Sequence, residues 1–259
     1  MPVRQWDGNS YDRISGTMEA LGLEVLDRLE LAGDELVLDA GCGSGRITET
    51  LLTRLPRGGV IALDESPSMV DAARKRLGPD ADVRVMDLLE LQLEQPVDAV
   101  LSTATFHWIA DHERLFACLH AALKPGGRLV AQCGGEGNIT VLRSSANEVL
   151  AREPYAQHFT DWRAPWNYAG AQPTRECLLA AGFSSAECWL TPAPREPEYP
   201  REFLSTIVLG PHVQQLPEEL RERFMDDVLA ELGEPVVVDY VRLNIDAVAG
   251  SSPPASSAA

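Results

Sequence analysis

Apolar positions between residues 36 and 132 fall into short runs that are separated by longer amphipathic stretches. Strands that alternate with helical stretches indicate βαβ units and a parallel sheet, and near-continuous apolar runs are typical of strands covered on both faces. The pattern therefore predicts an α/β fold with a doubly wound sheet. The runs expected to form its strands are LVLDA (36–40), VIALD (60–64), VRVM (83–86), VDAVLS (97–102) and RLVAQ (128–132).

Helix signals lie between these runs. Ser66 is placed to cap a helix whose apolar positions repeat at helical spacing until Gly78 ends it. Asp111 is placed to cap a second helix, which the turn KPGG (124–127) ends. Residues 18–29, ahead of the first strand, have the spacing of a further amphipathic helix.

The periodic pattern loosens after residue 132. Residues 154–173 carry aromatic residues and prolines without a clean period, which is typical of a loop or lid. Beyond them, helices at 174–181 and 218–232 and strands at 186–190 and 236–241 are expected.

Composition limits the choice of partners. The sequence has 22 Lys and Arg residues against 39 Asp and Glu residues, a formal net charge of −17, which repels nucleic acids and anionic lipid surfaces. No basic patch offsets this charge, and no apolar stretch has the length of a membrane span or a signal peptide. The five cysteines form no C-x-x-C pair, so neither a disulfide framework nor a zinc site is indicated. We therefore expect a cytoplasmic protein that acts on a small molecule, without a nucleic acid or membrane partner.

Candidate cofactor chemistry begins at the end of the first predicted strand. The strand runs directly into GCGSGR, where glycines at 41, 43 and 45 let the backbone approach a ligand closely. Arg46 stands where the dinucleotide fingerprint G-x-G-x-x-G has its last glycine, which disfavours NAD. The turn also lacks the G-K-[ST] ending of a triphosphate-binding loop.

Two aspartates follow the next two predicted strands. Asp64 ends the second strand, where a carboxylate can accept hydrogen bonds from both hydroxyls of a ribose. Asp87 follows the third strand, where it can accept a hydrogen bond from the exocyclic amine of adenine. Each feature alone is also explained as a turn or a helix cap. Together they lie at the carboxyl edge of one sheet, where open α/β sheets bind ligands, and they predict a nucleoside site.

The segments DAGCGSG, ALDESPSMV, VMD and STATFHWIADHERLFACLHAALKPGGRLV, in this order, resemble the motifs of class I S-adenosylmethionine (SAM)-dependent methyltransferases over residues 30–135. The resemblance implies a seven-stranded, mostly parallel, Rossmann-like sheet with a helical cap, and SAM as cofactor. The phrase FHWIADH is similar to the F-Q-W-x-x-D-H segment of trans-aconitate methyltransferases and their small-molecule relatives. His107 stands here in place of the glutamine.

The resemblance also implies roles for residues on the cofactor side. Asp64 holds the ribose, Met69 lies beside the adenine, and Thr103 faces the transferred methyl group. The adenine amine is contacted by Asp87 and Leu88. The methionine end of SAM is lined by Asp39, Gly41, Cys42 and Gly43.

His107 and Trp108 are the candidate catalytic residues, because they follow the fourth strand where methyl group and acceptor should meet. If the acceptor is a hydroxyl or an amine, a proton must leave and His107 is the candidate base. If the acceptor is a carboxylate, no base is needed and His107 only orients it. His107, His112 and His120 do not have the spacing of a zinc site, so we expect no metal.

The acceptor pocket is expected to draw on aromatic residues. His107, Trp162 and Trp166 are its candidate substrate contacts, and Tyr11 is the candidate lid aromatic near the N-terminus. Three arginines are candidates to clamp a carboxylate, although scattered arginines are usually surface residues. They are Arg143, Arg152 and Arg163.

These observations predict an N-terminal lid helix (1–30), a SAM-binding core (31–135), a remainder with substrate-cap insertions (136–250) and a disordered tail (251–259). The expected enzyme is a SAM-dependent methyltransferase that modifies a carboxylate, hydroxyl, amine or carbon of a small molecule. The alternatives are a SAM-binding enzyme that catalyses a decarboxylation or cyclisation, and a non-catalytic SAM-binding regulatory protein. The sequence leaves the acceptor and the oligomeric state open.

Overall fold

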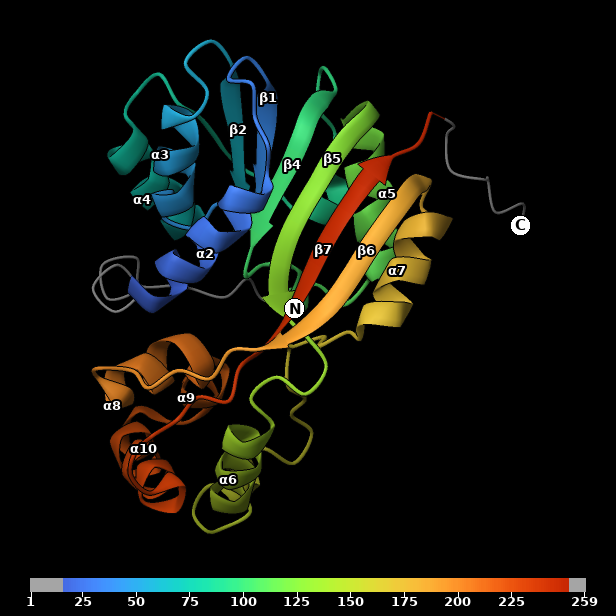
Figure 1. The fold of residues 1–259 in the computed structure, drawn as a ribbon. Helices are drawn as coiled ribbons and strands as arrows, with labels where there is room; N and C mark the ends of the chain where they lie inside the picture. The colour runs from blue at the N-terminus through green and yellow to red at the C-terminus, as the bar shows by residue number, and fades with distance from the viewer. Residues whose placement is uncertain (1–15, 252–259) are drawn as a thin grey trace.

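The computed structural model describes residues 16–251, and its centre is a seven-stranded sheet with the strand order β3-β2-β1-β4-β5-β7-β6 (Figure 1). Strands β1 to β5 pair in parallel, and β7 is antiparallel to both of its neighbours. The predicted doubly wound, mostly parallel sheet is therefore confirmed. The strands are β1 (Leu36–Ala40), β2 (Gly59–Asp64), β3 (Asp82–Val85), β4 (Val97–Thr103), β5 (Leu123–Gly134), β6 (Phe183–Pro192) and β7 (Val241–Ala249).

Helices cover both faces of this sheet, because successive apolar residues of each central strand point to opposite sides. Val37 and Leu38 of β1 are both fully buried, but they belong to different hydrophobic clusters. On the side of Val37 lie α2 (Gly16–Arg28), α3 (Arg46–Thr53) and α4 (Pro67–Leu77) (Figure 1). On the side of Leu38 lie α5 (His112–Ala122) and α7 (Ala171–Ala180).

Both predicted helix caps are present. The Ser66 hydroxyl accepts a hydrogen bond from the Met69 amide at 3.5 Å, and the Asp111 carboxylate accepts one from the Arg114 amide at 2.9 Å. Short 3₁₀ turns follow two strand ends, at η1 (Leu88–Glu90) and η2 (Phe106–Trp108), and a third is η3 (Ala156–His158).

The predicted turn at KPGG (124–127) is wrong. Residues 124–127 do not form a separate turn between helix and strand, because β5 already begins at Leu123. Val97 of β4 pairs with Leu123, and Ala99 pairs with Arg128, so the intervening residues of β5 bulge out of register.

A cap lies beyond the carboxyl ends of β4 and β5 (Figure 1). It contains α6 (Thr140–Leu150), α8 (Pro200–Phe203), η4 (Leu204–Val208), α9 (Gly210–Gln215) and α10 (Glu218–Leu232). Its buried residues, such as Tyr155 and Phe224, form a hydrophobic cluster separate from the two that line the sheet. Helix α10 has the predicted bounds, whereas α6 had not been predicted as a helix.

The predicted strand at 236–241 is wrong, because the last strand of the sheet is β7. The apolar run before β7 belongs to the cap instead, where Val238 and Tyr240 are buried. Val238 makes only an isolated bridge to Arg195. The true strand, VRLNIDAVA, was missed because it places polar side chains at buried positions, including Arg242 and Asn244.

Candidate functional site

The glycine turn after β1 folds under the end of β2. The amides of Gly41 and Cys42 donate to the carbonyl of Leu63 at 2.8 and 2.9 Å. A Cβ on Gly41 would lie 2.1 Å from the Thr105 hydroxyl oxygen, so no larger residue fits there. Gly43 has a φ of 54°, and a Cβ on it would meet nothing within 4 Å. Gly43 therefore leaves open space above the backbone, as a close-binding ligand requires.

Asp64 joins this turn to the end of β2. One carboxylate oxygen accepts from the Gly43 amide at 2.9 Å, and the other accepts from the Ser66 amide at 2.9 Å. Burial raises the pKa of Asp64 above its ordinary value, and the two amide hydrogen bonds oppose that rise. The expectation that Asp64 and the glycine turn lie at the same edge of the sheet is confirmed.

Asp39 precedes the turn, Cys42 is part of it, and both are buried. Asp39 is 1% exposed and accepts a hydrogen bond from the Thr48 hydroxyl at 2.6 Å. Burial raises the pKa of Asp39 to about 6. Burial also raises the pKa of the Cys42 thiol well above its ordinary value, so Cys42 is a packed thiol and not an activated nucleophile.

The residues expected around the adenine follow β2 and β3. Asp87 is exposed and its carboxylate accepts from the Leu89 amide at 2.8 Å, while Leu88 and Met69 are buried. Glu65, which follows Asp64 directly, was not predicted from the sequence. Burial first, and then the charges of Asp87 and Asp64, raise the pKa of Glu65. This part of the site is rich in hydrogen-bond acceptors, as the hydroxyls and amine of an adenosine require.

The end of β4 carries the chain from the glycine turn to η2. Thr103 is the last residue of β4, and Ala104 after it has a φ of 57°, a conformation that costs energy for a residue with a side chain. The Thr105 hydroxyl donates to the carbonyl of Gly41 at 3.3 Å. This hydrogen bond connects the end of β4 to the glycine turn. His107 follows in η2.

His107 is 8% exposed, and its ring is held in one orientation. Its Nδ1 accepts a hydrogen bond from the Gly134 amide at 3.3 Å. The ring stacks on Tyr168 with centroids 5.8 Å apart and lies 5.1 Å from the Trp108 ring. Because Nδ1 acts as an acceptor, the neutral ring carries its proton on Nε2. His107 is therefore built to donate a hydrogen bond from Nε2.

A small cavity of about 50 Å³ adjoins His107, between the sheet edge and the cap. Trp108 and Trp166 both line it, with ring centroids 6.0 Å apart. The structure thus brings three of the predicted acceptor-side residues together. Its lining residues are Ala104, His107, Trp108, Asn138, Ile139, Trp166, Tyr168, Ile207, Val208, Tyr240 and Arg242.

Trp162 lies one ring farther from the cavity. Its ring centroid is 4.5 Å from that of His212, which is in turn 5.6 Å from Trp166. Burial, and then the charge of Arg143, lower the pKa of His212 to about 4, so this ring is neutral at pH 7. Tyr11 lies outside the described residues.

Arg242 lines the cavity as well, and it was not predicted from the sequence. It is 3% exposed, its Nε donates to the side-chain oxygen of Gln132 at 3.2 Å, and its guanidinium lies over the Tyr240 ring. Among the described residues that line the cavity, Arg242 alone carries a formal charge. The sequence did contain one signal for Arg242: a charged residue within the alternating run VRLNIDAVA.

The predicted arginine clamp is only partly supported. Arg143 lies near the cavity, with its guanidinium 5.9 Å from the ring centroids of both Trp166 and Tyr168. Arg152 instead pairs with Glu231 on the cap surface, and Arg163 is exposed. Among the described residues, no three His, Cys, Asp or Glu side chains lie close enough together to hold a metal ion.

Comparisons with known proteins agree with this arrangement. A methyltransferase-domain family model matches residues 37–127. The chain is 30% identical over 239 residues to a trans-aconitate 2-methyltransferase from an Acidovorax species, covering 90% of each protein. It is 32% identical over 194 residues to a trans-aconitate 2-methyltransferase from Methylobacterium nodulans, covering 74% of this chain and 69% of that protein.

A solved structure with the same fold is phosphoethanolamine N-methyltransferase 2 from Haemonchus contortus, in complex with phosphomonomethylethanolamine and S-adenosylhomocysteine (SAH). The TM-score is 0.61 at 20% identity, and the match covers 95% of this chain and 57% of that one. The carboxyl edge of the sheet fits SAM, because Gly43 leaves room above the backbone and Asp64 supplies carboxylate acceptors. The chain therefore belongs to the class I SAM-dependent methyltransferases, of the type that includes the trans-aconitate 2-methyltransferases, and it transfers a methyl group from SAM to a small molecule.

Proposed function

We propose that the methyl acceptor is the carboxylate of a small organic acid, bound in the cavity beside His107 with Arg242 as its counter-ion. The observation that carries the proposal is the position of Arg242, whose buried guanidinium lines the cavity beside His107. A buried cation favours an anionic ligand strongly, because both charges leave water. The relatives named for trans-aconitate support an acid as acceptor.

We assign the cofactor contacts to the carboxyl edge of the sheet. Asp64 binds the ribose, Met69 lies beside the adenine, and Thr103 lies nearest the transferred methyl. The adenine amine is bound by Asp87 and Leu88. The methionine end is bound by Asp39, Gly41, Cys42 and Gly43. The supporting observations are the open space at Gly43 and the acceptors grouped around Asp64.

His107 orients the acceptor in this proposal and does not remove a proton. SAM supplies an electrophilic methyl group when bound, and a carboxylate oxygen is already a nucleophile, so no proton has to leave. His107 presents Nε2–H, which can hold one carboxylate oxygen while Nδ1 stays on the Gly134 amide. Trp108 and Trp166 exclude water from the acceptor, and Trp162 supports them through His212.

We also propose how the chain is divided. Residues 31–135 bind the cofactor, and residues 136–250 add two sheet strands and the cap that covers the acceptor. Support comes from the cap's own hydrophobic cluster. Residues 1–15 of the proposed lid and residues 252–259 of the proposed tail lie outside the described residues. No observation on the described residues favours a decarboxylation, a cyclisation or a purely regulatory role.

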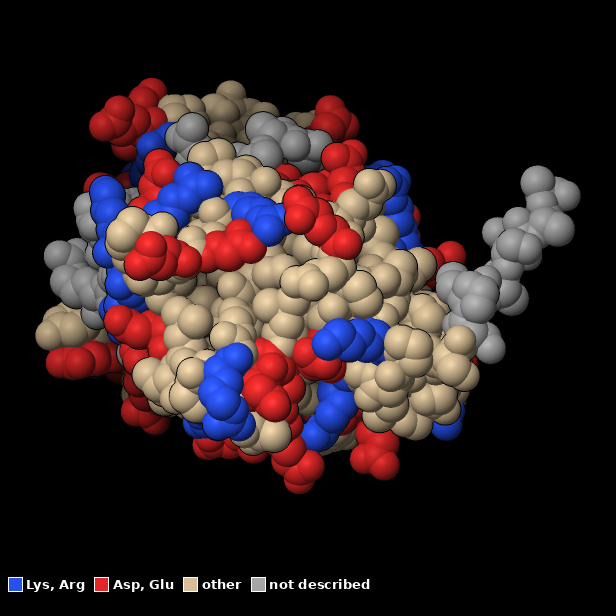
Figure 2. All heavy atoms as spheres, turned by 90° about the horizontal axis from the view of Figure 1, so that it is seen from above, with Lys and Arg blue, Asp and Glu red and all other residues tan. Residues whose placement is uncertain are grey.

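We infer a cytoplasmic enzyme without a nucleic acid partner. The net charge is −17, and on the face in Figure 2 acidic and basic side chains are interspersed, without a continuous basic patch. Within residues 16–251, no helix combines the length and apolar character that a membrane crossing needs.

Arg242→Met tests the acceptor assignment. With a panel of small carboxylic acids and SAM, the variant should lose at least ~100-fold in kcat/KM for whichever acid the wild type methylates, since a buried charge pair contributes several kcal/mol. SAM affinity, measured by calorimetry, should stay within about threefold. Arg163→Met, at an exposed position, is the control and should behave as wild type. Equal kcat/KM for the Arg242→Met and Arg163→Met variants would exclude Arg242 as the counter-ion.

A further inference from the structure

We infer that Gln132, Asn244 and Arg28 are positioning residues that hold the guanidinium of Arg242 for the acceptor. They are joined by side-chain hydrogen bonds, and together we call them the polar chain. This role rests on the proposed function, in which Arg242 binds the carboxylate of the acceptor. Three features of the described residues support it.

The first feature is the place of the polar side chains on β7. Successive residues of a strand point to opposite faces of the sheet, and Leu243 and Ile245 belong to the hydrophobic cluster on the side of α5 and α7. Arg242 and Asn244 therefore point to the side of α2, and each is 3% exposed. Buried polar side chains weaken a sheet core unless they find partners, so their presence here indicates a role other than core packing.

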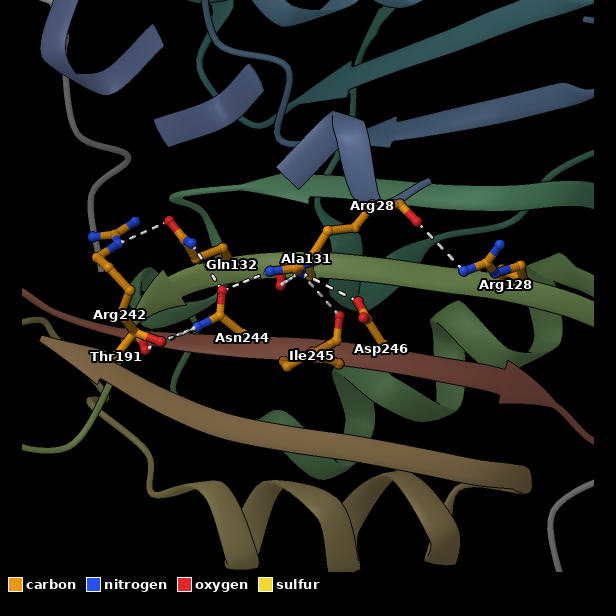
Figure 3. Close-up of polar contacts among 9 residues, drawn as sticks. All are labelled: Arg28, Arg128, Ala131, Gln132, Thr191, Arg242, Asn244, Ile245 and Asp246. Carbon is orange, nitrogen blue, oxygen red and sulfur yellow. Dashed lines mark hydrogen bonds and ion pairs between the residues drawn. The ribbon is translucent and has the colours of Figure 1, made fainter. Parts of the chain in front are cut away.

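The second feature is a side-chain contact that holds Arg242 (Figure 3). Gln132 lies on β5, is 7% exposed, and its side-chain oxygen accepts from Nε of Arg242 at 3.2 Å. This hydrogen bond uses Nε and so occupies neither terminal nitrogen of the guanidinium. Because a guanidinium is planar, a fixed Nε–H direction also restricts where the terminal nitrogens lie. The Gln132 contact therefore helps to set the direction in which Arg242 presents its charge.

The third feature is that Gln132 is itself held. Asn244 lies directly opposite Gln132 in the antiparallel pair of β5 and β7, and its side-chain oxygen accepts from Nε2 of Gln132 at 2.9 Å. The same oxygen accepts from Nη1 of Arg28 at 2.6 Å. The Asn244 nitrogen donates to the Thr191 hydroxyl at 3.1 Å. The polar chain thus runs from α2 through Asn244 and Gln132 to Arg242.

The two arginines decide how both amides of the polar chain are oriented. A guanidinium can only donate, so Arg28 requires the oxygen of Asn244, and Arg242 requires the oxygen of Gln132. With its oxygen toward Arg242, Gln132 presents its nitrogen to the oxygen of Asn244. Either amide, if reversed, would place its N–H groups against an arginine. The polar chain therefore has one favourable arrangement, and Arg28 helps to enforce it.

Holding Arg242 should matter for the acceptor. A guanidinium that is already fixed binds a carboxylate more tightly than a mobile one, because less side-chain entropy is lost on binding. Loss of the polar chain should therefore raise KM for the acid more than it lowers kcat, and it should leave SAM binding unchanged.

Gln132→Met removes the oxygen that holds Arg242 and keeps a similar side-chain volume. The kinetics use trans-aconitate, the acid named for the relatives, or the panel acid with the highest kcat/KM if the wild type does not methylate trans-aconitate. The variant should lose at least ~10-fold in kcat/KM, with SAM affinity within about threefold of wild type. Thr191→Val is the control and should behave as wild type, because Thr191 contacts only the nitrogen of Asn244 and leaves the oxygen to Arg28 and Gln132.

A double-mutant cycle separates positioning from a general loss of structure. If Gln132 acts through Arg242, kcat/KM of the double variant Gln132→Met with Arg242→Met should lie within about threefold of Arg242→Met alone. A structural role would instead make the two losses multiply. Losses that multiply, or a wild-type kcat/KM in folded Gln132→Met, would overturn the inference.

Arg28→Met tests the other end of the polar chain and applies even if Gln132→Met does not fold. Its kcat/KM should fall by about 3- to 10-fold, because Gln132 alone then holds the Asn244 oxygen. Arg128→Met is the matched control, since Arg128 contacts the backbone carbonyl of Arg28 and not its side chain. Equal kcat/KM for Arg28→Met and Arg128→Met would contradict the inference.

Hydrogen exchange of the Arg242 Nε–H gives a measurement that needs no acceptor. It is followed by NMR, and the resonance is assigned by its absence in Arg242→Lys. Exchange should be at least ~10-fold faster in Arg28→Met than in wild type, and unchanged in Arg128→Met. Unchanged exchange in Arg28→Met would overturn the inference whether or not the proposed function holds. Faster exchange in a protein that methylates no acid would support the polar chain and contradict only the proposed function.

Discussion

The two halves of the site are built in different ways. Residues assigned to SAM lie between Asp39 and Thr103, and each comes at or near the carboxyl end of one of the parallel strands β1 to β4. The acceptor cavity combines segments from 104 to 242, contributed by both the sheet and the cap. Cofactor binding therefore depends on local turns and strand ends, while acceptor choice depends on tertiary packing. A variant in one half should therefore change either SAM binding or acceptor binding, but not both.

Gly43→Val should have the largest effect, and only on the cofactor half. A valine at a φ of 54° is strained, and its side chain would occupy the open space that SAM requires. Calorimetry should detect no SAM binding. Gly78→Val is the matched control, because Gly78 also has positive φ and open surroundings but follows the last residue of α4 and is not part of the glycine turn. Both variants should lose about 1–2 kcal/mol of stability from backbone strain; SAM binding by Gly43→Val would refute the assignment.

Asp64→Ala should weaken SAM binding by about 1.5–3 kcal/mol, roughly 10- to 150-fold, the range for hydrogen bonds to a charged group. Asp64→Asn keeps one oxygen acceptor and should lose less. Circular dichroism must show both variants folded, since Asp64 also holds the Gly43 and Ser66 amides. Unchanged SAM affinity in folded Asp64→Ala would remove Asp64 from the cofactor site.

Asp39 should make the cofactor half sensitive to pH. Burial raises its pKa from the ordinary 3.8 to about 6, so between these values the folded protein binds more protons than the unfolded chain. The contribution of Asp39 to stability is therefore greatest below pH 4 and is lost as the pH rises through 6. Asp39→Asn, which still accepts from Thr48, should gain about 1–3 kcal/mol at pH 7.5 and much less at pH 4. Urea unfolding at the two pH values measures this; a gain that does not vary with pH would contradict it.

His107→Gln should have the smallest effect, and only on the acceptor half. If His107 orients a carboxylate, glutamine can accept from the Gly134 amide and donate to the acceptor in its place. KM should then change more than kcat, and the pH profile of kcat should be retained. A kcat loss of roughly 10²-fold, together with loss of the neutral limb of the profile, would identify His107 as a base and point to a hydroxyl or amine acceptor.

The sequence predicted the cofactor half well, because its signals are local. The strand LVLDA and the Ser66 and Asp111 caps depend on residues close together in the chain, and the structure confirms them. Asp64 and the glycine turn each follow a predicted parallel strand, so their place at one edge of the sheet could be predicted too. Whether these residues bind SAM as assigned stays a prediction.

The acceptor half was harder to predict, because tertiary contacts determine it. Arg242 is buried in β7 by contacts with Gln132, which is distant in the sequence, and no local periodicity reveals such a partner. The apolar run at 236–241 resembles a strand but packs into the cap instead. The same packing brings Trp166, which aromatic content had suggested, next to His107 and Trp108, which their position after the fourth strand had suggested.

The most direct test of the account is the identity of the methylated product. The protein is incubated with SAM carrying a ¹³C-labelled methyl group and a panel of small carboxylic acids, and products are analysed by mass before and after mild alkali. The expected product is a labelled methyl ester that alkali hydrolyses back to the acid, and this product should be absent with Arg242→Met. A labelled product that resists alkali, such as an ether or an N-methyl amine, would contradict the claim that the acceptor is a carboxylate.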